Sequence, residues 1–139
     1  MVNENLVTIT TAEKGMLCRA LAKHMPKLRK LLKLSQREFG YRVGVSVDRV
    51  SLIENGHFQM TWSQFTSFLF IFSLNKATKE YFVENKLIDK RILQYLQMKT
   101  PDEEPEMSIL LSESMASAFA SLSMSDVISK LKEREKYPM

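Results

Sequence analysis

The chain has 139 residues, of which 45% are hydrophobic and 26% charged, and its formal net charge is +4. This length fits one domain with at most an appendage, and the apolar share is sufficient for a hydrophobic core. The sequence has no apolar run near the ~18 residues of a membrane span, and its polar N-terminus does not resemble a signal peptide. The single cysteine, Cys18, excludes an internal disulfide, so we expect a cytoplasmic protein.

The charge is distributed unevenly along the chain. Residues 1–60 carry +5, residues 61–100 carry +3, and residues 101–139 carry −4, which together give the net +4. A basic body followed by an acidic tail is typical of a nucleic-acid-binding protein whose tail has another role. Ordinary surface charge explains the same distribution equally well, so charge alone does not separate the two interpretations.

The first predicted helix begins near Thr11. Thr10 and Glu13 have the spacing of a capping box, and the residues before them are expected to fray. Apolar residues then recur every three or four positions, as a helix with one buried face requires. Pro26 lies inside this pattern, and we expect a single helix that is kinked near His24.

The stretch 34–56 predicts two short helices joined by a tight turn. Ser35 is an N-cap for the first helix, and Gly44 supplies the left-handed backbone conformation that ends it. Ser46 caps the second helix. Two helices this short, with so few residues between them, must cross steeply in a helix-turn-helix arrangement. The buried face of the second helix is expected to consist of Val50 and Ile53.

A family resemblance rests on the segment SQREFGYRVGVSVDRVSLIENG. It resembles the DNA-binding half of the phage-repressor-type (XRE, Cro-like) helix-turn-helix regulators. The matching features are Ser-Gln at the first helix start, the Val-Gly-Val-Ser turn and the closing Ile-Glu-Asn-Gly. The resemblance extends from about Met25 to about Asn75, and MTWSQFTSFLFIFSLN more loosely suggests one bacterial subgroup. It implies a transcriptional regulator, repressor-like, whose second helix enters the major groove of double-stranded DNA.

The side of the second helix opposite its buried face is expected to meet base edges. It carries Val47, Asp48, Ser51 and Leu52. None of these is an Arg, Lys, Asn or Gln able to make a bidentate base contact. Val47 can pack on a thymine methyl, and Asp48 can accept from cytosine N4 or simply stabilise the helix N-terminus. Leu52 is apolar where DNA or solvent is expected, which favours a protein contact.

A second group of residues is expected at the phosphates or on the flank of the groove. Gln36 matches a family position at a helix N-terminus, where its amide N–H and its side chain both donate. Arg49 lies on the flank of the second helix, and His57 lies in the loop that follows. Arg37 and Lys30 complete the group. For each, a plain solvent-exposed or structural role is the alternative.

The resemblance also implies a structural ion pair. In the family, an arginine at the position of Arg29 pairs with the glutamate of the Glu-Asn-Gly motif, which is Glu54 here. A bidentate pair of this kind would lock the second helix against the preceding basic helix.

The chain continues with further helices. Thr61 begins a capping box, and the helix after it, apolar on nearly all sides, runs to about Ser73. We expect one of its faces in the core of the helix-turn-helix and the other against later helices. A further helix starts at Asn75 or Thr78, and Asp89 caps another.

Residues 99–106 contain two prolines and four acidic residues, a composition typical of a linker. Residues 107–139 carry two helical patterns, the last capped by Ser125. This tail is too small to be a domain. Its apolar residues must dock on the body or pair with a second chain, and we favour a homodimer because two-fold regulators read two half-sites. The alternative is that the tail binds a different protein partner.

The sequence thus predicts an all-α protein. A bundle of about five to six helices containing the helix-turn-helix spans 1–98, followed by an acidic linker at 99–106 and a helical tail at 107–139. No catalytic set, phosphate loop or metal-ligand spacing is present, so we expect no enzyme activity, metal or cofactor. The predicted function is a DNA-binding transcriptional regulator. The alternative is a protein-interaction or antitoxin-type module on the same frame, with weak DNA binding.

Overall fold

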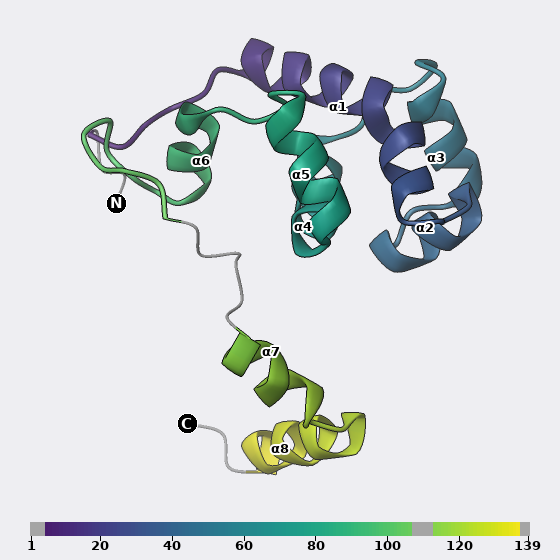
Figure 1. The fold of residues 1–139 in the computed structure, drawn as a ribbon, viewed down its shortest axis with the longest axis vertical. Helices are drawn as coiled ribbons and strands as arrows, with labels where there is room; N and C mark the ends of the chain where they lie inside the picture. The colour runs from purple at the N-terminus through teal and green to yellow at the C-terminus, as the bar shows by residue number, and fades with distance from the viewer. Residues whose placement is uncertain (1–4, 107–112, 137–139) are drawn as a thin grey trace. The chain divides into compact units, whose positions relative to one another are not determined.

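The computed structural model describes residues 5–106 and 113–136, and these residues contain eight helices (Figure 1). The described residues contain no β-strand, so the predicted all-α class is confirmed. The chain divides into two units, Met1–Glu106 and Met107–Met139. The helices of the first unit are α1 Thr11–Leu31, α2 Gln36–Val43, α3 Val47–Glu54, α4 Trp62–Leu74, α5 Lys76–Glu84 and α6 Lys90–Leu96; those of the second are α7 Glu113–Ala120 and α8 Met124–Lys136.

Local capping sets the starts of the helices in the first unit. Thr10, Ser35 and Thr61 each close a capping box with the residue three positions later. Ser46 accepts a hydrogen bond from a backbone N–H at the start of α3, and Asp89 does the same at the start of α6. These five starts confirm the sequence predictions, because a cap depends only on residues within one turn.

α1 continues through Pro26 as a single helix, as predicted. Proline removes one backbone hydrogen bond from a helix interior and normally destabilises it there. Burial on either side offsets this cost, because Met25 and Leu28 are fully buried. His24 adds a tertiary contact, since its Nδ1 lies 2.6 Å from the Tyr81 hydroxyl of α5.

The core of the first unit is built around the aromatic side chains of α4. The ring of Phe39, fully buried on α2, lies 5.3 Å from the rings of both Phe68 and Phe72. Phe72 lies 6.0 Å from Phe82 of α5 on the other side. Fully burying such a side chain contributes roughly 1.5–3 kcal/mol. α4 therefore joins the helix-turn-helix to the later helices, as expected, although Phe70 is 55% exposed.

The turn between α2 and α3 depends on two glycines. Gly44 has φ = 72°, the left-handed conformation that the sequence predicted. Gly40 has a different role, which sequence reasoning missed. A Cβ at Gly40 would lie 2.3 Å from the carbonyl oxygen of Val45. Glycine at this position therefore lets the backbone of the turn pack directly on α2.

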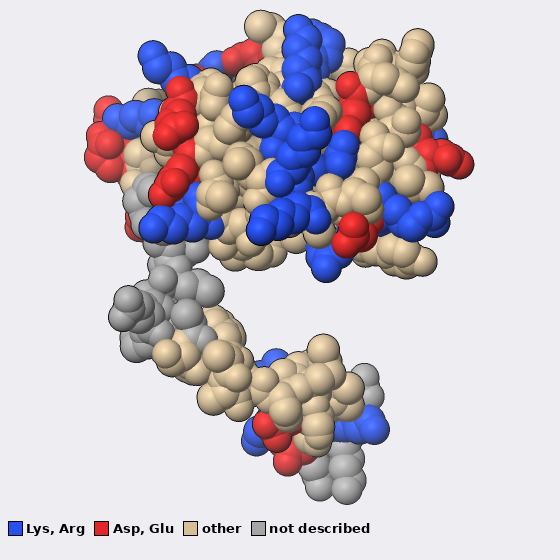
Figure 2. Space-filling model, turned by 45° about the vertical axis from the view of Figure 1, so that its right-hand side comes forward, with Lys and Arg blue, Asp and Glu red and all other residues tan. Residues whose placement is uncertain are grey.

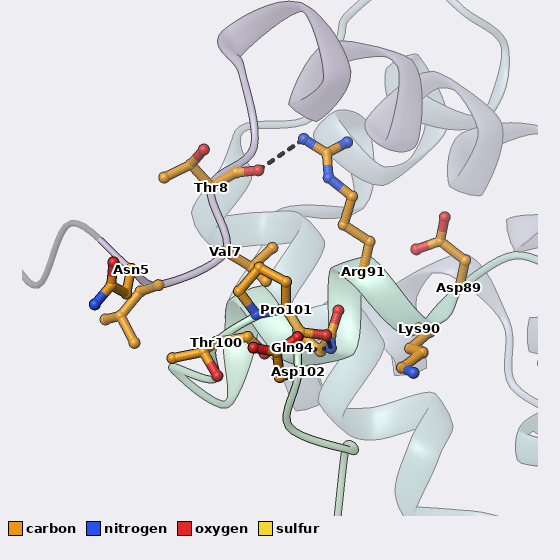
Figure 3. A pocket seen from close by; sticks show the side chains of 11 residues that line it. Asn5, Val7, Thr8, Asp89, Lys90, Arg91, Gln94, Thr100, Pro101 and Asp102 are labelled. Carbon is orange, nitrogen blue, oxygen red and sulfur yellow. Dashed lines mark hydrogen bonds between the residues drawn. The ribbon is translucent and has the colours of Figure 1, made fainter.

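Residues 5–9, which we expected to fray, lie against the end of the first unit formed by α6. The Val7 amide donates to the Lys99 carbonyl at 2.9 Å, and Arg91 donates to the Thr8 carbonyl at 2.8 Å. Arg91 also forms an ion pair with Glu13 of α1. Figure 3 shows the open pocket between the N-terminal segment, α6 and residues 100–102.

Residues 99–106, which we expected to form a linker, are held against α6 and belong to the first unit. The buried amide of Gln94 donates to three carbonyls of this segment, at 2.8 to 3.4 Å. Lys90 pairs with Glu104 at 2.7 Å, and Lys99 pairs with Glu106 at 3.0 Å. The acidic composition thus reflects complementarity to the lysines in and after α6.

The second unit contains α7 and α8. α8 begins two residues earlier than predicted, because Ser123 rather than Ser125 caps it. The Ser123 hydroxyl accepts from the Asp126 amide at 3.1 Å, and the Asp126 carboxylate accepts from the Ser123 amide at 3.2 Å. Exposed apolar side chains lie on both helices and between them in this unit: Phe119, Leu122, Met124, Val127, Ile128 and Leu131. The first part of the tail, 107–112, lies outside the described residues.

Candidate nucleic-acid interface

α3 is fixed on one side and open on the other. Val50 and Ile53 are fully buried and face the core. The four residues predicted to meet base edges lie on the remaining surface: Asp48 and Leu52 are exposed, and Val47 and Ser51 are half-buried. Leu52 is 40% exposed in the chain as described. The structure therefore brings these four side chains together on one side of a short helix.

A buried cluster connects α3 to α1 and α2. Arg29 of α1 donates from Nε and Nη2 to the two carboxylate oxygens of Glu54, at 2.6 and 2.8 Å. The side chains of Arg29 and Glu54 are 12% and 5% exposed. Hydrogen bonding to Glu54 raises the pKa of the Arg29 guanidinium above its ordinary value. The pair implied by the family resemblance is present, and it fixes the orientation of α3.

Gln36 joins this cluster through its side chain. Its Nε2 donates to Glu54 Oε1 at 3.1 Å, so the side chain is engaged within the protein. The backbone N–H groups of the first turn of α2 lack intrahelical partners, as at any helix start. We expected both the backbone amide and the side chain of Gln36 to donate to a phosphate, and the structure shows the side chain donating to Glu54.

Arg49 is held at the flank of α3 by an aromatic ring. Its guanidinium carbon lies 3.6 Å from the centroid of Phe58, in the loop after α3. Stacking uses the face of the guanidinium and leaves its in-plane N–H groups available to an acceptor. Helical periodicity predicted that Arg49 lies on the flank, but not that it stacks on Phe58. An aromatic residue two positions after the helix-ending Asn55-Gly56 was the available signal.

The other predicted flanking residues, Arg37, Lys30 and His57, are all exposed. The backbone N–H of His57 donates to the Leu52 carbonyl at 2.9 Å and to Asn55 Oδ1 at 3.1 Å, which holds the loop against the end of α3. The structure thus keeps these candidates accessible without bringing them into one cluster.

Lys30 belongs to a row of exposed cations along α1, which we call the basic ridge: Arg19, Lys23, Lys27 and Lys30. Steps of three and four residues place them on one side of a helix. Arg19 donates to Gln59 at 3.1 Å, which ties the ridge to the loop after α3. Figure 2 shows Lys and Arg side chains gathered across the middle of one face of the first unit.

Three further features concern the chemistry that the described residues can support. Among residues 5–106 and 113–136, no group of three His, Cys, Asp or Glu residues is arranged to hold a metal ion. No helix in that part of the chain is long and apolar enough to cross a membrane. Burial raises the pKa of the Cys18 thiol, which keeps it in the unreactive neutral form.

Comparison of the chain with family models, curated proteins and solved structures finds no match. Its function is therefore inferred from the geometry and chemistry of its own residues.

Proposed function

We propose that the chain is a sequence-specific transcriptional regulator of the phage-repressor type that places α3 in the major groove of double-stranded DNA. The observation that carries this proposal is the state of α3: a capped helix of eight residues, locked by a buried ion pair on one side and exposed on the other. A major groove about 12 Å wide admits a helix presented in this way.

The charge around α3 supports an anionic partner. α1 carries six Lys or Arg, of which Arg29 is paired with Glu54, and its single acid, Glu13, is paired with Arg91. On α3, the stacked Arg49 offers a cation at the flank, where phosphate oxygens border the groove. Asp48 is the one exposed acid on α3, so the overall field still favours DNA.

We also propose that the regulator acts as a homodimer joined through the second unit. α7 and α8 form too small a unit to enclose a core, and Phe119, Leu122 and Leu131 are each more than half exposed. A second copy of the same hairpin would cover them. Two-fold pairing would also supply two α3 helices, one for each half-site of a two-fold DNA site.

A protein-interaction module of antitoxin type is the second candidate. The specific observation in its favour is Tyr41 on α2, which is 81% exposed, together with the exposed Leu52 on α3. Large exposed apolar side chains on neighbouring helices are typical of a surface that another protein covers.

Binding to a pool of random duplexes, measured by fluorescence anisotropy across a range of salt concentrations, tests the DNA proposal. We expect log K to fall with log salt with a slope of about −4, which means that four or five phosphates are neutralised. Arg49→Gln should make the slope less negative by about 0.9. Lys90→Gln is the control, because α6 lies at the opposite end of the first unit from α3 (Figure 1).

Salt-independent or absent binding would refute the DNA proposal and favour the protein-interaction module. If Arg49→Gln and Lys90→Gln change the slope of log K against log salt equally, the chain binds DNA but α3 does not lie beside the phosphates.

A further inference from the structure

The exposed surface of α3 is chemically unusual for a helix that reads DNA. Its outward side chains are two aliphatic groups, one carboxylate and one hydroxyl, from Val47, Leu52, Asp48 and Ser51. The bidentate contacts that most often identify guanine and adenine need Arg, Lys, Asn or Gln, and this surface has none of them. The surface must therefore recognise other features of the base pairs if the proposed function holds.

Each base pair offers a distinct edge in the major groove. Guanine presents two acceptors, N7 and O6, which repel a carboxylate and give an aliphatic group no partner. Thymine presents a C5-methyl group, the one apolar feature of the groove, and cytosine presents the N4 amino donor. The aliphatic groups of α3 therefore complement the thymine methyl group, and its carboxylate complements the cytosine amino group.

We propose that α3 selects its DNA site through thymine methyl groups contacted by Val47 and Leu52, and that Asp48 accepts a hydrogen bond from a cytosine amino group. This inference rests on the proposed function. Ser51 discriminates little, because a hydroxyl can donate or accept.

We assign Arg49 to the phosphates rather than to guanine. Its guanidinium lies 3.6 Å from the centroid of Phe58, in the loop that follows α3, and this stacking holds it at the flank of the helix. At that position it serves the phosphates and contributes affinity rather than sequence information. The cations around α3 thus contribute affinity for DNA, and the small apolar contacts on α3 select the sequence.

The four exposed cations of the basic ridge argue for DNA as the occupant of this surface over an apolar protein partner. A protein that covered Leu52 would have to be strongly acidic. The experiment below separates these occupants, because only DNA responds to removal of a single methyl group from its bases.

The test compares thymine with uracil, which lacks only the C5-methyl group. Duplexes enriched from a random pool by the full chain are synthesised with thymidine or with deoxyuridine, and binding is measured by anisotropy at fixed salt. We expect about a fourfold loss of affinity per contacted methyl, the ratio that corresponds to about 0.8 kcal/mol for one buried carbon. The enriched sites should also contain thymines in each half-site.

Protein variants assign the effect to α3. Leu52→Ala should reduce the thymine-to-uracil affinity ratio at one position to near one, and Leu52→Met should retain it because the apolar contact remains. Leu52 is exposed, so neither change disturbs the core. Val83→Ala is the matched control, since Val83 is an equally apolar side chain, 73% exposed on α5.

The outcomes separate the two proposals. Equal affinity for thymine and uracil sites, with salt-dependent DNA binding intact, would refute methyl recognition and leave the regulator proposal standing. An unchanged ratio in Leu52→Ala, with Val47→Ala also unchanged, would refute the assignment to these side chains. No salt-dependent binding to either duplex would refute the regulator proposal, and methyl recognition with it.

Discussion

Removal of Arg29 tests whether the buried ion pair fixes α3. In Arg29→Met, the Glu54 carboxylate keeps one neutral donor, Gln36 Nε2 at 3.1 Å, in place of three donors. The Glu54 side chain is only 5% exposed, so water cannot replace the lost partner well. Breaking a buried pair by removing one partner costs about 3–5 kcal/mol. Because a domain has only about 5–15 kcal/mol of stability in total, the expected loss is large.

Urea unfolding of the full chain, followed by far-ultraviolet circular dichroism, measures this loss. The double variant Arg29→Met with Glu54→Leu removes both charges and should be more stable than the sum of the single losses predicts, with a coupling of about 2 kcal/mol. Lys90→Met is the control. It breaks the exposed pair between Lys90 and Glu104, whose side chains are 54% and 79% exposed, and it should change stability little.

Two results would refute this reasoning. Arg29→Met could be as stable as Lys90→Met, in which case the cluster does not stabilise the fold. Alternatively, the losses in the double variant could be additive, in which case Arg29 and Glu54 act independently despite their contact.

Three further predictions concern other parts of the chain. Gly40→Ala should lower the free energy of unfolding by about 1–3 kcal/mol, because its Cβ would overlap the Val45 carbonyl; wild-type stability in urea would contradict this. Hydrogen bonding to Arg91 lowers the pKa of Glu13 from 4.5 to about 2, so its contribution to stability is full above pH 4.5 and is lost as the pH falls through about 2. The stability difference between wild type and Glu13→Gln should therefore shrink over that range in acid titrations, and a constant difference would argue against the Arg91 contact. Leu131→Glu places a charge on the exposed apolar face of α8 and should convert the proposed dimer to a monomer in sedimentation. Thermal unfolding of the first unit should not change, and a persistent dimer would exclude α8 from the interface.

The sequence predicted features that depend on neighbours in the chain. Thr10, Ser35, Ser46 and Thr61 cap helices where expected, because a cap bonds to an amide three residues away. The same locality explains why the outward surface of α3 could be predicted from helical periodicity. The misplaced cap at Ser125 was a choice between two nearby serines that satisfy the same rule.

The errors concern contacts between distant segments. Residues 5–9 were expected to fray, yet Thr8 accepts from Arg91 across 83 positions of sequence. Residues 99–106 were expected to be a linker, because their prolines and acids gave no sign that Gln94 would satisfy their carbonyls. The side chain of Gln36 completes the buried Glu54 cluster, a contact that the sequence did not indicate.

The sequence by itself therefore determined the helices, the turn and the identity of the residues on the open side of α3, because these follow from local backbone chemistry and helical period. Only the tertiary structure decided which polar groups remain available to a ligand. Hydrogen bonds and stacking across the fold engage Gln36 within the protein and hold Arg49 on Phe58, and no periodicity along the chain encodes those pairings.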